Sequence, residues 1–113
     1  MAITNKALVE GAQLATSATA EYTAPGNTTT ILKKVTVTNT TSSAQTVTIY
    51  LVASGGSAGA SNCITSAQTV AANAVYEAYE CENHVLMTGD SIQALASAAS
   101  SLTLRVSGIE IQQ

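Results

Sequence analysis

The chain has 113 residues, enough for one domain and too few for a second core. It carries 4 Lys+Arg against 7 Asp+Glu, a formal net charge of −3, and only 10% of its residues are charged. This balance excludes a basic nucleic-acid surface and a polybasic membrane anchor. Aromatic residues make up 4%, all of them tyrosine, so stacking platforms and aromatic cofactor walls are nearly absent and we expect no enzyme and no cofactor.

The first residues contain no apolar segment of the kind that a signal peptide needs, and no run is long enough to span a membrane. We expect one domain over residues 1–113, in which residues 1–14 form an N-terminal arm or an edge strand. An arm would reach an adjacent subunit. Ala-rich sequence blurs the period of two weaker strands, which are predicted at Ala7–Leu14 and Ala18–Tyr22.

The clearest strand pattern covers two segments, Ile31–Asn39 and Thr46–Val52. Val35 and Val37 alternate with threonines in the first, and the second alternates in the same way. Alternation with β-branched residues is typical of a half-buried strand, because successive side chains point to opposite faces. The polar residues between the two segments have hairpin length, so we predict that they form a hairpin.

The second half of the chain continues in strands. After a flexible Gly/Ser-rich loop over Ala53–Asn62, a second pair of strands is predicted at Cys63–Val70 and Val75–Glu82. One turn of helix near Asn83 remains an open alternative. Ile92–Ala96 precedes a closing strand from Leu102 to Ile111, which Gly108 interrupts as a bulge or a close backbone approach.

About eight strands at regular spacing, with no convincing helix, predict an all-β fold. The expected architecture is a single-domain antiparallel β-sandwich that is jelly-roll-like.

Two patterns resemble catalytic or phosphate-binding motifs and lack essential parts. The loop with Gly55, Gly56 and Gly59 has no Lys-Ser/Thr and no following helix to hold a phosphate. His84 and Asp90 are the only histidine and aspartate, and no nucleophile elbow accompanies them. We therefore predict no catalytic residues.

Glu77, Glu80, Glu82 and His84 form a local acidic cluster. The last three would share one face of a regular strand, so an interfacial divalent ion is geometrically possible. We favour a solvated edge strand whose charges discourage aggregation, and predict no metal site.

Cys63 and Cys81 lie 18 residues apart and form no CxxC motif. Two reduced thiols are the favoured interpretation, and pairing across two strands is the alternative.

The remaining candidates are surface groups. Lys33 and Lys34 are consecutive and should point to opposite faces, although either could contact a carboxylate of a partner. Outward tyrosines are reasonable interface anchors, but a core role is equally common. The sequence singles out no interface residue among the four tyrosines, Tyr22, Tyr50, Tyr76 and Tyr79.

Three runs give the sequence a family resemblance. They are residues 22–40 (YTAPGNTTTILKKVTVTNT), 46–56 (TVTIYLVASGG) and 89–111 (GDSIQALASAASSLTLRVSGIEI). The chain resembles small β-sandwich virion proteins of tailed bacteriophages over most of its length. The resemblance lies in a turn, two hairpins and a closing strand, and it includes no binding motif.

The resemblance implies a structural protein of the virion, most simply a capsid decoration or cement subunit on the capsid surface, made in the bacterial cytoplasm. Its partners would be the major capsid protein and further copies of itself, with a trimer favoured, and neither nucleic acid nor membrane. The alternative is a tail, head–tail connector or host-surface-binding module. A carbohydrate-binding domain is a weaker possibility.

Overall fold

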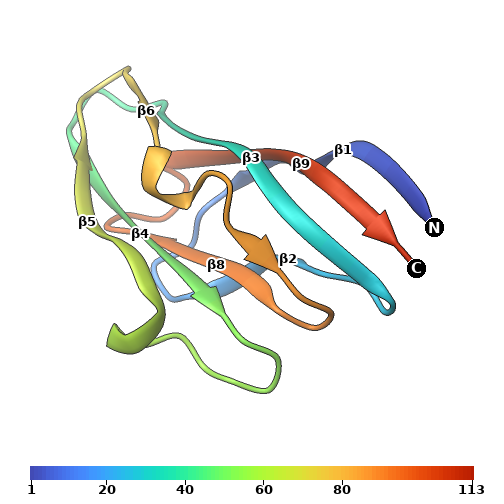
Figure 1. Ribbon diagram of the computed structural model, residues 1–113. Helices are drawn as coiled ribbons and strands as arrows, with labels where there is room; N and C mark the ends of the chain where they lie inside the picture. Colours follow the sequence, from blue (N-terminus) through green and yellow to red (C-terminus); the bar gives the residue numbers. More distant parts are fainter.

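A computed structural model describes residues 1–113 and shows two antiparallel β-sheets that face each other across one core (Figure 1). The first sheet, sheet A, has the strand order β1-β9-β3-β6, with the short β7 also paired to β3. The second, sheet B, has the order β2-β8-β4-β5. The strands are β1 (Ala2–Gln13), β2 (Thr19–Thr23), β3 (Thr28–Asn39), β4 (Gln45–Val52), β5 (Cys63–Val70), β6 (Val75–Glu77), β7 (Val85–Leu86), β8 (Ser91–Ala96) and β9 (Leu102–Gln112).

The strand order is that of a jelly roll, so the predicted all-β sandwich is confirmed. Apart from β7, the chain alternates between the sheets at almost every step, and β4 and β5 alone are consecutive strands that pair. Two four-stranded sheets wound in this way are the defining feature of a jelly roll.

The core lies between the sheets and is built from the inward residues of each alternating pattern. Val35 and Val37 of β3 are fully buried, while Thr36 and Thr38, which alternate with them, are partly exposed. Val47 and Ile49 face them from β4 and are also fully buried. The residue periodicity therefore assigned the faces of these strands correctly.

The predicted hairpin and the second predicted strand pair are both wrong, because β3 and β4 lie in different sheets, and so do β5 and β6. The polar segment after Asn39 crosses from one sheet to the other instead of turning back. Asn39 is 1% exposed, and its Nδ2 donates hydrogen bonds to the carbonyl oxygens of Ser43 at 2.8 Å and Val70 at 3.0 Å. Its side chain thus ties the end of β3 to the crossing loop and to β5 in sheet B.

The predicted strand Val75–Glu82 is too long, because β6 ends at Glu77. A single 3₁₀ turn, η2 (Tyr79–Cys81), follows it. The helical turn considered near Asn83 is absent there, since Val85–Leu86 forms β7 and Asn83 itself has a positive φ of 67°. The other 3₁₀ turn, η1 (Ala60–Asn62), closes the Gly/Ser-rich loop.

Gly108 is a close backbone approach and not a bulge. β9 runs without interruption, and the extra residues lie on its neighbours, at Leu8 of β1 and Lys33 of β3. A Cβ atom on Gly108 would collide with the carbonyl oxygen of Ile31 and lie 2.6 Å from Cδ1 of Leu8.

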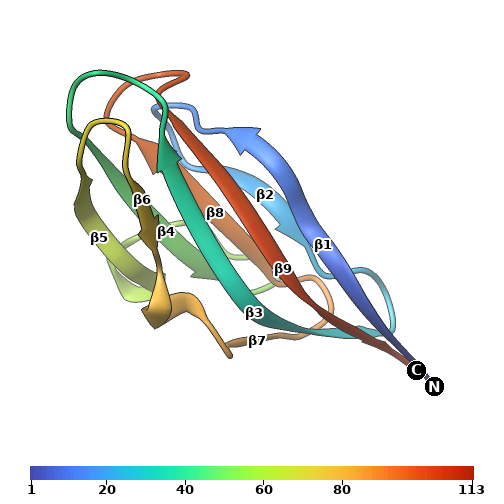
Figure 2. The same ribbon diagram turned by 90° about the horizontal axis from the view of Figure 1, so that it is seen from above.

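The two ends of the chain lie side by side at one tip of the molecule (Figure 2). There Ala2 pairs with Gln112 across β1 and β9, and β3 continues the sheet on the other side of β9. The segment 1–14 therefore contains an edge strand, β1 (Ala2–Gln13), within its own subunit and does not form an extended arm. No helix of the chain has the length and apolarity needed to cross a membrane.

Candidate functional site

The outer face of sheet A carries an exposed group of branched apolar side chains near the terminal tip. Cross-strand pairing places them in two rows, one joining Ile3 to Ile111 and the other joining Ile109 to Ile31 and Val85. Ile3 is 65% exposed and Val85 is 51% exposed, and the other three are partly exposed. We call these five residues the outer patch.

The outer patch exists because the apolar residues of β9 shift from even-numbered to odd-numbered positions along the strand. Leu102, Leu104 and Val106 occupy even positions and are fully buried, whereas the next apolar residues are Ile109 and Ile111. Since β9 has no bulge, the odd-numbered isoleucines must point outward. A bulge at Gly108 would have turned both isoleucines into the core.

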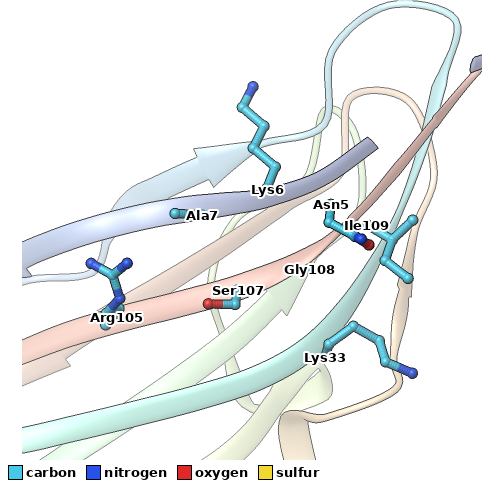
Figure 3. A pocket seen from close by; sticks show the side chains of 8 residues that line it. All are labelled: Asn5, Lys6, Ala7, Lys33, Arg105, Ser107, Gly108 and Ile109. Atoms are coloured by element: carbon cyan, nitrogen blue, oxygen red, sulfur yellow. The ribbon is translucent and has the colours of Figure 1, made fainter. Parts of the chain in front are cut away.

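A shallow hollow of about 490 Å³ adjoins the outer patch on the same face (Figure 3). Lys33 and Arg105 stand at its two ends, with Ser107 and Asn5 between them. Lys33 Nζ contacts Asn83 Oδ1 at 3.2 Å, and Arg105 Nη1 donates to a backbone carbonyl at 2.9 Å. Neither cation has a carboxylate partner, because the two salt bridges of the protein use Lys6 and Lys34. We call this feature the cationic hollow.

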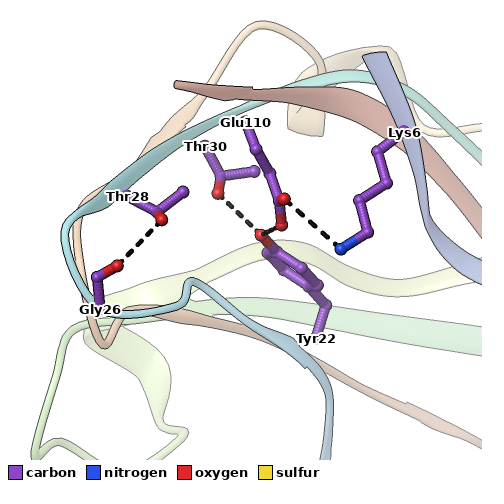
Figure 4. A network of polar contacts seen from close by, with 6 residues as sticks. All are labelled: Lys6, Tyr22, Gly26, Thr28, Thr30 and Glu110. Atoms are coloured by element: carbon purple, nitrogen blue, oxygen red, sulfur yellow. Dashed lines mark hydrogen bonds and ion pairs between the residues drawn. The ribbon is translucent and has the colours of Figure 1, made fainter. Parts of the chain in front are cut away.

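A polar cluster behind the outer patch fixes the tip (Figure 4). The hydroxyl of Tyr22 donates to Glu110 Oε2 at 2.5 Å and lies 2.8 Å from Thr30 Oγ1, and Lys6 Nζ lies 3.4 Å from Glu110 Oε1. The cluster joins β1, β2, β3 and β9. Burial, followed by the hydrogen bond to Glu110, raises the pKa of Tyr22 to about 12, so the hydroxyl keeps its proton over the physiological range.

The predicted acidic cluster is retained only in part. Because η2 replaces the expected strand, Glu80 turns toward Thr65 and Tyr76, whereas Glu82 accepts a hydrogen bond from the backbone of Val35. His84 is exposed. Glu77 and Glu82 remain neighbours, because burial and then contact with the Glu77 carboxyl raise the pKa of Glu82. Glu77, Glu80, Glu82 and His84 do not form one cluster, since no group of three potential metal ligands occurs in the protein.

The catalytic and phosphate-binding candidates also have structural roles. Both carboxylate oxygens of Asp90 accept backbone hydrogen bonds, from Ser54 at 2.9 Å and Met87 at 3.0 Å. In the Gly-rich loop, Gly59 donates its N–H to Asn62 Oδ1 at 3.0 Å, and Gly56 donates to Ala53 at 2.9 Å. These N–H groups are already used within the loop.

Both cysteines are free thiols. Cys81 is fully buried and its Sγ lies 3.5 Å from Thr65 Oγ1. Burial raises the pKa of the Cys81 thiol to about 11, which makes it unreactive. Cys63 is partly exposed and lines a second shallow hollow of about 500 Å³ on sheet B, together with Tyr50. Tyr79, at 70% exposed, is the most open tyrosine.

The contacts of Glu80 predict a measurable acid dependence of stability. Partial burial raises its pKa, but the hydrogen bonds from Thr65 and Tyr76 outweigh this effect and hold the pKa below its usual value of 4.5. A lowered pKa adds stability above about pH 4.5 that is lost as the pH falls through the folded-state pKa. We expect Glu80→Gln to reduce this loss of stability, measured by urea unfolding between pH 3 and 7.

Glu10→Gln is the control for Glu80→Gln, because the Glu10 carboxylate is exposed and makes no hydrogen bond. An unchanged slope in Glu80→Gln would contradict the assignment.

Comparison with known proteins gives a likeness of fold. No family model matches the sequence, and no curated protein matches it. Among solved structures, a chain from Bacillus endospore appendages, which form disulfide-linked pili, is 16% identical with a TM-score of 0.59. The match covers 97% of this chain and 88% of that one. A chain from the Gx strain of infectious bursal disease virus is 13% identical with a TM-score of 0.49, over 98% of this chain and 32% of that one.

Sequence reasoning missed the outer patch and the cationic hollow. The strand pattern places Ile109 and Ile111 in the closing strand without deciding their face, and it gives no link between Lys33 and Arg105. The shift of the apolar residues from even to odd positions at Gly108 is the sequence pattern that predicts the patch. The hollow has no comparable signal, because it depends on the pairing of β3 with β9.

Proposed function

We propose that this protein is a structural subunit of a virion, and more specifically a capsid decoration or cement subunit that binds the major capsid protein of a bacteriophage. The outer patch is the observation that carries the proposal. A surface of five branched apolar residues beside two unpaired cations suits a partner with apolar and acidic side chains. The proposal includes no catalytic activity, no cofactor, and neither nucleic acid nor membrane as a partner.

Two further points support a structural role. The sequence resembles small virion proteins of tailed phages, and its jelly roll is similar to a chain from pili, a second kind of assembly built from repeated subunits. A chain with only 10% charged residues is also better suited to closely fitted neighbours than to isolation in water.

A filament subunit is a second candidate with a specific observation in its favour. The similar chain belongs to disulfide-linked pili, and Cys63 is a free, partly exposed thiol here. Within the virion, the decoration role competes with a role in the tail, in the head–tail connector or in host-surface binding.

Immunogold labelling distinguishes these locations. Antibodies against the purified protein are applied to particles and filaments from cultures of the organism that carries the gene. Label over phage heads is the expected result. Label confined to tails or to the head–tail junction would move the protein to that location, and label along surface filaments would favour the pilus role; each would overturn the decoration role.

Ile111→Asp tests the outer patch itself. We expect this variant to lose at least tenfold in co-sedimentation with purified particles, because it buries a charge against the partner. Thr103→Asp is the matched control, since Thr103 lies on the same face of β9 at the far end of the strand. Equal binding of both variants and the unmodified protein would contradict a role for the patch.

A further inference from the structure

The free edge of β1 differs from the other sheet edges of the molecule. From Ala2 to Ala7 it pairs with β9 in unbroken register, and the first bulge occurs at Leu8. No strand lies on its other side, and residues 2–6 are all exposed. In an antiparallel strand every second residue directs its N–H and C=O away from the paired neighbour. This stretch therefore presents a regular row of unused backbone donors and acceptors.

The remaining edges are short or irregular. β2 has five residues and a register shift, and β5 has two register shifts and a positive φ of 45° at Ala67. β6 and β7 have only three and two residues. Bulges and short length are the usual means by which proteins prevent unwanted pairing at an edge. β1 lacks this protection between Ala2 and Ala7.

We propose that the free edge of β1 binds the same edge of a second copy of this chain, in an antiparallel pair with Thr4 on the two-fold axis. In an antiparallel pair, two residues that lie directly opposite each other point to the same face of the sheet. The two-fold axis must therefore lie where one residue faces its own copy, and not midway between two consecutive positions of the chain. An axis at Thr4 pairs Ile3 with the partner's Asn5 and Ala2 with the partner's Lys6. An axis at Asn5 would bring the bulged Leu8 into the pair.

The side chains in this register are compatible with self-pairing. Lys6 is the only charged side chain between Ala2 and Ala7, and it lies opposite an alanine in the pair. Its ammonium group is already neutralised by Glu110 at 3.4 Å. The edge thus lacks the unpaired lysine that blocks edge-to-edge association in many proteins. A second copy fits because neither strand brings a like charge to the other.

The pairing has a consequence for symmetry and for the outer patch. An edge that binds itself generates a closed two-fold dimer, whereas a three-fold ring needs two different surfaces on each subunit. The geometry thus favours a dimer, whereas the resemblance to virion proteins implied a trimer. It also places the two Ile3 side chains on the same face of one joined sheet, so the two outer patches lie next to each other.

The oligomeric state of the purified protein tests the proposal. We expect a dimer by light scattering after size exclusion, and a monomer for Thr4→Lys, because two lysines would lie directly opposite each other on the axis. Glu110, which lies across from Thr4 on β9, is already paired with Lys6 and cannot neutralise a second lysine in full. Thr69→Lys is the control, since Thr69 is exposed on the bulged edge strand β5. A monomer of the unmodified protein at its highest soluble concentration, a trimer, or a dimer that survives Thr4→Lys would each overturn the proposal.

Disulfide trapping tests the register. In a Cys63→Ser background, Thr4→Cys should form a disulfide-linked dimer under mild oxidation, because a residue on the axis faces itself at cross-strand distance. Ile3→Cys should cross-link far less, since it faces the partner's Asn5. Equal cross-linking of the two variants would contradict the register. These measurements need no other protein. If they contradict the dimer, the proposed virion role still stands. If the virion role fails its own test, the evidence for the dimer is unaffected.

Discussion

Truncation of Leu104 to alanine is expected to lower the free energy of unfolding by about 2–5 kcal/mol. Leu104 is fully buried on β9, where it lies between Val37 of β3 and Ala12 of β1. The substitution removes apolar contacts and leaves a cavity that strands held on both sides cannot close. Since small domains have total stabilities of only about 5–15 kcal/mol, we expect this single change to remove a large share of the total.

Urea unfolding at neutral pH measures the effect of Leu104→Ala. Val75→Ala is the matched control, because Val75 is an apolar strand residue that is 63% exposed. Its effect should stay within about 0.5 kcal/mol. Similar losses in the two variants would show that Leu104 does not lie in a packed core.

Gly108→Ala is expected to destabilise the protein by about 1–3 kcal/mol, although it adds only one methyl group. The added carbon would collide with the backbone carbonyl oxygen of Ile31 and with Leu8 Cδ1. A side chain could rotate away, but the carbonyl oxygen of Ile31 can move only if β3 moves. Because β3 also pairs with β6 and β7, the displacement would spread through sheet A.

The control for Gly108→Ala is Gly26→Ala. An added Cβ at Gly26 would have no atom within 4 Å, so its thermal midpoint should stay nearly unchanged. Thermal unfolding followed by circular dichroism compares the two variants. A Gly108→Ala variant as stable as the unmodified protein would mean that β3 and β9 do not approach as closely as the structure shows.

The sequence was a good guide to which residues form strands and which face is buried, and a poor guide to strand pairing. Val35, Val37, Val47 and Ile49 lie on the predicted apolar rows, and all four are fully buried. Alternation records only that one face of a strand is covered. The alternation is the same whether the next strand in the chain lies beside the first or across the core, so the predicted hairpin and the second predicted strand pair both failed.

The crossing after β3 depends on interactions that a local pattern does not contain. Asn39 reaches Val70, which is 31 positions away in the chain, and this contact exists only once the second sheet is in place. The cationic hollow has the same origin, because Lys33 and Arg105 come together through the pairing of β3 with β9. The outer patch, by contrast, could have been recognised from the odd-numbered isoleucines after Gly108.

The position of β9 in sheet A also affects how the chain must fold. β9 lies between β1 and β3, although it is the last of the nine strands to be synthesised. Until it emerges from the ribosome, β1 has no strand to pair with, and its apolar residues, such as Val9, stay uncovered. Contacts between such distant parts of a sequence close slowly, typically in milliseconds to seconds for all-β domains. The two halves of sheet A therefore cannot join before β9 has been synthesised, and until then the nascent chain is vulnerable to aggregation and proteolysis.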